Sequence, residues 1–168
     1  MNQPKATRTI GIAPVSKSVR VSASAERAFH IFTRRFDRWW PRSHHIGDVP
    51  VKEFVLEPFV GGRWYERRED GSECQWGKVL GWEPPSRLVL AWQLNPKFAY
   101  DPELVTTVEV RFVAESPDVT RVELEHRDLE RMGDEAQPLR DKFDSPSGWG
   151  AIIEAYAKQL PKETDHVA

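Results

Sequence analysis

The stretch VTTVEVRFVAESPDVTRVELEHR, residues 105–127, decides the fold. Apolar side chains occupy alternate positions in both of its halves, at Val108, Val110, Phe112, Val122 and Leu124. A period of two is typical of strands with one buried face, and the Ser-Pro-Asp between the halves is a turn signal. The stretch therefore predicts two antiparallel strands, 105–114 and 120–127, joined by a short turn.

Five more strands are predicted by the same alternation and by turn residues at their ends, such as Gly61-Gly62 and Pro84-Pro85. Their expected bounds are Lys17–Ser22, Val51–Leu56, Arg63–Arg68, Glu73–Trp82 and Arg87–Leu94. The segment Asn95–Pro102 is irregular. Since most of these strands follow one another through short connections, the sheet is expected to be an antiparallel meander.

Helical spacing of apolar residues flanks this run of strands. One helix is expected after a cap at Ser22 or Ser24, continuing to Trp39-Trp40-Pro41, where the proline ends it. A short element at Asp134–Phe143 precedes a longer C-terminal helix that starts at Pro146. Its apolar face comprises Trp149, Ile152, Ile153, Tyr156 and Leu160. A sheet with one solvated face needs such a cover, so the pattern predicts an α+β helix-grip fold: a curved antiparallel sheet of six to seven strands around the C-terminal helix.

Size and composition favour one domain in a reducing compartment. We expect an N-terminal arm at 1–14, with a short strand at Thr9–Ile12, then a domain at 15–161 and a tail at 162–168. The formal net charge is −2 and no basic face stands out, so nucleic acid is not an expected partner. Cys74 is the single cysteine, and no signal-peptide or membrane-spanning run is present, which predicts a cytoplasmic protein without stable membrane association.

Strand parity identifies the side chains that face the predicted helix. Period two places His126 on the same inward face as Leu124, where a buried imidazole needs a partner and tends to stay neutral. In the strand 63–68 either Trp64 and Glu66 or Tyr65 faces inward; the first choice makes Glu66 the natural partner of His126. In the strand 73–82, Trp76, Leu80 and Trp82 share parity, but Lys78 sits among them; a bulge there is one way for the strand to switch faces.

Several motifs resemble those of a known family. They are Trp39-Trp40-Pro41 with the following His-containing loop, Glu57–Arg63, Trp76–Val79, Trp82–Leu88, Glu123–Arg127 and Gly148-Trp149. The chain resembles the heat-shock-protein-ATPase-activator-like branch of the START/polyketide-cyclase superfamily over roughly Val15–Leu160. The resemblance implies a helix-grip fold with a deep cavity, in a superfamily whose members bind lipids, polyketides or plant hormones. Its founding co-chaperones act with an additional N-terminal domain, for which this chain has no room, so we expect no chaperone partner.

We therefore expect a small hydrophobic or aromatic molecule, lipid-like or polyketide-like, to bind between sheet and helix. The expected mouth and lining residues are Trp39, Trp40, His44, His45, Trp64, Glu66, Trp76, Trp92, Val110, Phe112, Leu124, His126, Trp149, Ile153 and Tyr156. Binding is preferred to catalysis. The first alternative is a cyclase or dehydratase with Glu66 and His126 as acid–base residues. The second is a protein-binding adaptor, and a homodimer through the arm or an edge strand is compatible with the pattern.

Other chemistries find little support. His44, His45 and Asp48 lack the spacing of a metal site, and adjacent histidines in an extended loop point apart. Cys74 has no nucleophile signature, and Gly61-Gly62 leads into a strand rather than a helix, which is typical of a turn and not of a phosphate loop. No metal and no cofactor is predicted.

Overall fold

The computed structural model of the chain describes residues 11–163, and within them seven strands form one antiparallel sheet in the order β1-β7-β6-β5-β4-β3-β2. The strands are β1 Val15–Val21, β2 Val51–Leu56, β3 Arg63–Arg68, β4 Glu73–Glu83, β5 Arg87–Trp92, β6 Thr106–Ser116 and β7 Val119–Arg127. The helical elements are α1 Ala25–Arg34, α2 Phe36–Trp39, η2 Leu129–Glu135, α3 Ala136–Asp144, α4 Trp149–Gln159 and η3 Leu160–Lys162. The helix-grip prediction is confirmed.

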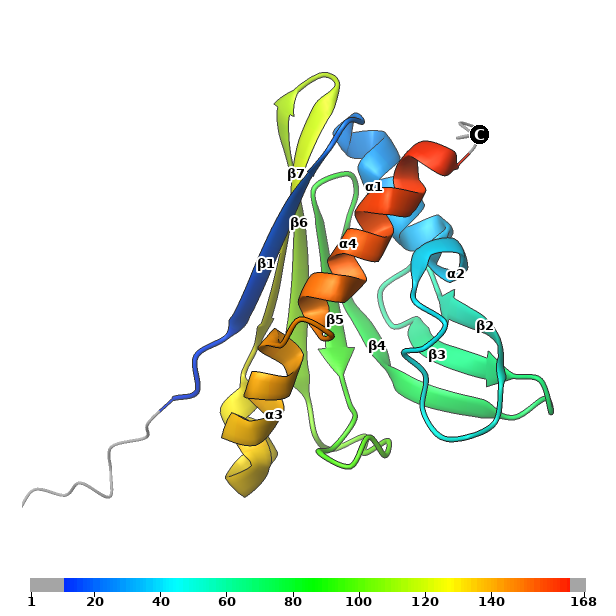
Figure 1. Cartoon of the computed structure of the whole chain (residues 1–168), viewed down its shortest axis with the longest axis vertical. Coiled ribbons are helices and arrows are strands. Elements are labelled where there is room, and N and C mark those ends of the chain that lie inside the picture. Colours follow the sequence, from blue (N-terminus) through cyan, green and yellow to red (C-terminus); the bar gives the residue numbers. More distant parts are fainter. Residues whose placement is uncertain (1–10, 164–168) are drawn as a thin grey trace, which may run out of the picture.

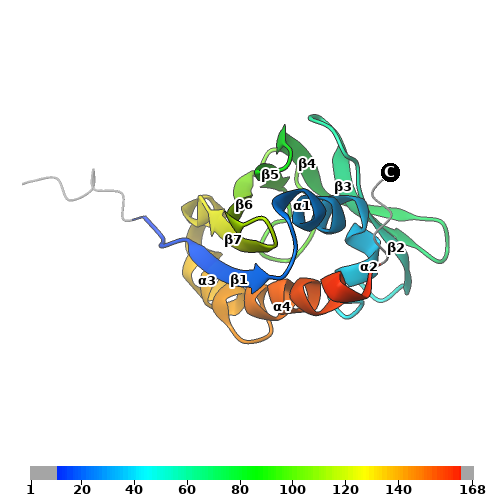
Figure 2. The same cartoon turned by 90° about the horizontal axis from the view of Figure 1, so that it is seen from above.

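The sheet is strongly curved, and its concave side holds the helices (Figure 1). Seen from above, α1 lies inside the arc of strands while α4 runs across the open side between β1 and β2 (Figure 2). The inner faces of the strands and helices therefore meet in one apolar core, as a sheet with a single solvated face requires.

The first predicted helix is divided into α1 and α2 at Arg35, whose φ of −112° and ψ of 28° leave the helical region. The Ser24 hydroxyl caps α1 by accepting a hydrogen bond from the backbone N–H of Arg27, which selects Ser24 over Ser22 as the cap. After the break, the indole of Trp39 donates to the carbonyl of Phe32 at 3.0 Å. This contact satisfies a buried donor and fixes α2 against α1.

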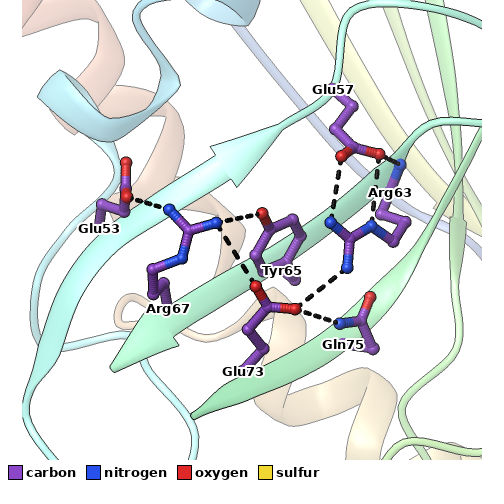
Figure 3. Close-up of polar contacts among 7 residues, drawn as sticks. All are labelled: Glu53, Glu57, Arg63, Tyr65, Arg67, Glu73 and Gln75. Carbon is purple, nitrogen blue, oxygen red and sulfur yellow. Dashed lines mark hydrogen bonds and ion pairs between the residues drawn. The ribbon is translucent and has the colours of Figure 1, made fainter. Parts of the chain in front are cut away.

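The face question in β3 is resolved in favour of Trp64 and Glu66, which are both fully buried on the inner side. Tyr65 points to the outer face, where the guanidinium of Arg63 lies 4.2 Å from its ring centroid and that of Arg67 lies 5.7 Å away (Figure 3). The same arginines bond to Glu57, Glu53 and Glu73. Tyr65 is thus buried beneath ion-paired arginines, not in the core.

Strand β4 changes face twice through bulges, one opposite β3 and one opposite β5. Trp76 and Val79 are buried although they are three residues apart, and Trp82 packs edge-on against Phe29 at 5.1 Å. Leu80 shares the parity of Trp76 and Trp82 but is 48% exposed, so the expected switch of faces by a bulge does occur in this strand. The extra residue at each bulge shifts the alternation by one, which moves Leu80 to the solvated face.

Two further predictions need correction. Helix α4 begins at Trp149 with Gly148 as its N-cap, because residues 145–148 form a turn in which the Gly148 N–H donates to the Ser145 carbonyl. Part of the strand expected at Thr9–Ile12 lies outside the described residues, and Gly11 and Ile12 are not in a strand. None of the helices formed by residues 11–163 is long and apolar enough to cross a bilayer.

On the convex face, Glu109 is buried beneath three arginines. Its carboxylate accepts from Arg87 at 2.7 Å, Arg111 at 2.8 Å and Arg127 at 2.6 Å. Desolvation by burial raises the pKa of Glu109, but the three hydrogen-bonded guanidiniums outweigh it and bring the pKa down to about 2. The folded state therefore favours the ionised carboxylate, which ties β5, β6 and β7 together.

Replacing Glu109 with glutamine is expected to destabilise the protein by about 1–3 kcal/mol at pH 7, and this difference should shrink in acid. The folded pKa lies below the ordinary value of 4.5, so the stabilisation is complete above pH 4.5 and is lost as the pH falls toward 2. Urea unfolding of both proteins at neutral pH and in acid measures this stabilisation. Glu125→Gln, an exposed carboxylate bonded to Arg127, is the control with little expected change. If the difference in unfolding free energy between the unmodified protein and Glu109→Gln stayed constant from pH 7 to pH 2, the low pKa of Glu109 would be contradicted.

Candidate functional site: an aromatic cavity

A cavity of about 620 Å³ opens at one end of the molecule, between the inner face of the sheet and the helical layer. Four segments enclose it: the α2–β2 connection, the inner ends of β4 and β5, the loop after β5, and the α3–α4 region. Its lining residues are Trp40, Ser43, His44, His45, Ile46, Gly47, Trp76, Trp92, Leu94, Lys97, Phe98, Lys142, Phe143, Ser147, Gly148, Trp149 and Ile152. The volume suits a molecule of several fused rings.

Six tryptophan and phenylalanine side chains line the cavity. Trp40 packs against Trp76 at 5.2 Å and against Trp149 at 6.0 Å between ring centroids. Trp92 packs against Trp149 at 5.8 Å and against Phe143 at 5.3 Å, edge to face. Since each ring is held by a neighbouring ring, the wall is stiff and presents both ring faces and ring edges to a ligand.

Phe98, the sixth aromatic residue, is held in an unusual backbone conformation, with φ at +61°. The Asn95 side chain makes this turn by accepting hydrogen bonds from the backbone N–H groups of Lys97 and Ala99. A left-handed φ is costly for a bulky residue, and such strain often accompanies function. The turn uses that conformation to place the Phe98 ring in the cavity wall, 6.4 Å from Phe143.

His126 is fully buried behind this wall and is not one of its lining residues. Its Nδ1 accepts from the indole N–H of Trp149 at 3.0 Å, so its Nε2 carries the proton and donates to the Thr106 hydroxyl at 2.8 Å. Burial lowers the pKa of His126 to about 3, which keeps the ring neutral. The imidazole also stacks on Phe143 at 4.9 Å. His126 therefore positions Trp149 and Phe143.

Glu66 is also fully buried, but it does not contact His126, and the predicted pairing of these residues is wrong. Its carboxylate accepts from the backbone N–H of Ile46 at 2.8 Å, from the Trp76 indole at 3.1 Å and from Arg68 at 3.3 Å. Three donors satisfy the charge inside the protein. Glu66 thereby fixes the α2–β2 connection and one aromatic wall residue.

The structure divides the other predicted site residues into two groups. Trp40, His44, His45, Trp76, Trp92 and Trp149 line the cavity together. The rest lie in the packed core without lining it: Trp39, Trp64, Val110, Phe112, Leu124, Ile153 and Tyr156. Three of these core residues are oriented by hydrogen bonds to backbone carbonyls: Trp39 donates to Phe32 at 3.0 Å, Trp64 to Ala91 at 2.9 Å and Tyr156 to Ala28 at 2.7 Å.

Sequence reasoning missed the lining residues that come from turns and from α3, chiefly Lys97, Phe98, Lys142 and Phe143. Period-two parity does not apply to an irregular segment, so it carried no information on Lys97 and Phe98. Ile152 was recognised only as part of the apolar face that contains Trp149. Ile152 follows Trp149 by three residues, a helical spacing that puts both on one face, and this was the available signal for placing Ile152 in the wall.

Within the described part of the chain, the ionisable groups of the lining are two histidines and two lysines. His44 Nε2 donates to the Ser147 carbonyl at 2.8 Å and so joins the α2–β2 connection to the turn before α4. Lys97 and Lys142 lie nearby in the lining, which contains no Asp or Glu among the residues described. Trp92 Nε1 and His45 Nδ1 are buried without a hydrogen-bond partner within residues 11–163.

Two other candidate sites do not compete with this cavity. A hollow of about 390 Å³ on the outer face includes Glu109, Arg111 and Glu123, which are already ion-paired. Burial raises the pKa of the Cys74 thiol and so disfavours the reactive thiolate. No group of three metal-ligating side chains lies together anywhere in residues 11–163.

Comparison with protein families and solved structures gives a consistent picture. The family described as activator of Hsp90 ATPase homolog 1-like protein matches residues 22–159. Among solved structures, the chain is 40% identical to the anthrahydroquino-γ-pyrone synthase Txn09, with 88% of this chain and 97% of that chain covered and a TM-score of 0.61. No curated protein sequence matches.

Two further solved structures share the fold. The self-sacrificing resistance protein CalC from Micromonospora echinospora is 32% identical, covers 91% of this chain and 97% of its own, and gives a TM-score of 0.67. The Aha1 dimer from Colwellia psychrerythraea is 16% identical, with 89% of this chain and 96% of that chain covered and a TM-score of 0.60. The latter similarity shows the fold alone.

Proposed function

Because the chain belongs to the family of activator of Hsp90 ATPase homolog 1-like proteins, which confirms the resemblance seen in its motifs, we propose that it binds a small aromatic, polyketide-like molecule in the cavity. The observation that carries this proposal is the gathering of six aromatic side chains around one space of about 620 Å³. Stacking and edge contacts with planar rings are the interactions that such a wall offers best.

The chemistry of the wall favours fused rings over a flexible lipid chain. Neighbouring tryptophan rings of the wall are tilted or nearly perpendicular to each other, in the pairs Trp40–Trp76, Trp40–Trp149 and Trp92–Trp149. Both ring faces and ring edges therefore border the space. A planar ligand meets both kinds of surface without losing the entropy of a mobile acyl chain. The relative that is 40% identical is named as a synthase of a fused aromatic pyrone, which supports the same class.

The second candidate is an enzyme of the cyclase or dehydratase type in the same cavity, and the synthase relative favours it. The acid–base groups would differ from those predicted, because neither Glu66 nor His126 lines the space. His44 and His45 do line it, and they are the imidazoles that a ligand would meet. Turnover that is lost in His45→Gln at unchanged ligand affinity would separate the enzyme from the binder.

The adaptor and homodimer hypotheses stay predictions. The exposed apolar residues Phe59, Val60 and Leu80 would be the surface to test for a protein partner. The Colwellia protein is described as a dimer, and sedimentation of this chain measures whether it associates in the same way.

The direct test is native mass spectrometry of the gently purified protein, followed by organic extraction and identification of any released compound. We expect a stoichiometric aromatic compound, or uptake of 2-(hydroxymethyl)anthraquinone with quenching of tryptophan fluorescence. A protein that carries nothing and does not take up a tricyclic quinone would count against the proposal.

Phe98→Gly is expected to weaken binding of this quinone at least about fivefold while changing stability little. Glycine removes the wall ring but adopts the left-handed φ without strain, so the lost packing and the relieved strain offset each other. The matched control is Phe59→Gly, which removes a 54% exposed ring outside the cavity. Equal affinity in the two variants, measured by fluorescence titration, would remove Phe98 from the site.

A further inference from the structure

We propose that the cavity selects aromatic ligands that carry an acid group, and that Lys97 and Lys142 at the mouth recognise the anion. This inference rests on the proposed function, because it concerns the ligand of the same cavity. It adds a charge requirement that the aromatic wall alone does not impose.

The first argument is the charge balance of the mouth. The chain has more acidic than basic residues, yet the cavity lining described here contains two lysines and two histidines and no carboxylate. Many cations on the outer face of the sheet are paired instead: Arg63, Arg87 and Arg127, for example, each hold two carboxylates. A segregated set of cations beside an apolar space raises the local concentration of anionic ligands.

The second argument is that both lysines lack an acidic partner among residues 11–163. Lys142 Nζ lies 5.1 Å above the ring of Phe98, a wall residue, and this cation–π contact holds the ammonium group at the mouth. Lys97 precedes Phe98 in the same turn and also lines the cavity. Lys142 from α3 and Lys97 from the loop after β5 therefore both border the cavity, each next to Phe98 in space or in sequence.

The third argument concerns hydrogen bonds deeper in the site. Three buried polar atoms of the described residues lack a partner, and two of them, Trp92 Nε1 and His45 Nδ1, belong to lining residues. An indole N–H can only donate, so it requires an acceptor oxygen, and leaving it unpaired is unfavourable. A quinone, phenol or carboxylate oxygen supplies that acceptor. The aromatic wall, the unpaired Trp92 indole N–H and the two lysines together favour a ligand that is an oxygenated aromatic acid.

The experiment compares two probes of the same shape at pH 7.5 and low salt: anthraquinone-2-carboxylate and neutral 2-(hydroxymethyl)anthraquinone. Tryptophan quenching or calorimetry gives the two dissociation constants. The carboxylate is expected to bind about tenfold more tightly, and 0.5 M NaCl should narrow the difference because ions screen exposed charges. The K97Q/K142Q double variant should remove the preference, because it should weaken binding of the carboxylate about tenfold more than binding of the alcohol.

The control is the K52Q/K158Q double variant, which makes the same change in net charge with two exposed lysines outside the lining. It should keep the preference. Equal affinity of the two probes in the unmodified protein would overturn this inference and leave the proposed function standing. A preference that survives in K97Q/K142Q would overturn the assignment to these lysines, and binding of neither probe would overturn the inference and the proposed function together.

Discussion

Replacing Gly77 with alanine is expected to lower the free energy of unfolding by about 3–5 kcal/mol and to abolish ligand binding. A Cβ at this position would lie 1.7 Å from the carbonyl oxygen of Ala91 and 2.6 Å from the indole nitrogen of Trp64. Those two atoms are the partners of a 2.9 Å hydrogen bond that passes over Gly77. An added methyl group must break this bond or separate β4 from β5.

The effect should reach the cavity because Trp64 packs against two wall residues, Trp76 at 5.4 Å and Trp92 at 5.8 Å. The matched control is Gly81→Ala in the same strand, where the nearest atoms to the new Cβ belong to the Val89 side chain, at 3.1 Å, and the backbone nitrogen of Val89 is 3.8 Å away. That side chain can shift, so we expect a change within about 1 kcal/mol. Chemical denaturation measures both, and equal stabilities would contradict the close approach at Gly77.

Replacing Glu66 with leucine is expected to destabilise the protein by about 2–4 kcal/mol. Leucine has a similar size but leaves the Trp76 indole and the Ile46 backbone N–H without their acceptor, in a site that water does not reach. Arg68 loses a carboxylate but keeps its 2.9 Å bond to the Ile46 carbonyl. The α2–β2 connection should loosen, which would weaken ligand binding indirectly.

Glu73→Leu is the control, since Glu73 lies on the outer face of the neighbouring strand and its ion pairs to Arg63 and Arg67 are partly exposed (Figure 3). A loss of no more than about 1 kcal/mol is expected there. Thermal unfolding and probe titration separate the two roles of Glu66. A Glu66→Leu protein with unchanged stability would contradict the structural role assigned to this carboxylate.

The failure of the Glu66–His126 pairing has a geometric reason. Parity placed both side chains on the inner face, and both are indeed buried there. The sheet order, however, puts β4, β5 and β6 between β3 and β7, which is four strand spacings, or about 19 Å along the sheet. Glu66 and His126 therefore bond to separate partners, and the local sequence pattern carries no information on the distance between their strands.

The lining of the cavity was likewise predicted only in part from the sequence. Four of the six aromatic wall residues were predicted from the sequence: Trp76, Trp92 and Trp149 from the inward faces of strands and helix, and Trp40 from its place in the expected mouth. Phe98 and Phe143 were not, and neither were Lys97 and Lys142. Their placement depends on how the turn after β5 and the end of α3 meet across the mouth, a contact between segments about 45 residues apart in the chain.

By itself, the sequence determined the order of strands and helices and the inward set on β5, β6 and β7, because alternation, helical spacing and turn residues are local properties of the chain. Its motifs also identified the family by resemblance. Only the tertiary structure decided the faces of β3 and β4, the partners of Glu66 and His126, and the cationic mouth. Bulges shift parity without a distinctive residue, and the curvature of the sheet sets which distant side chains meet.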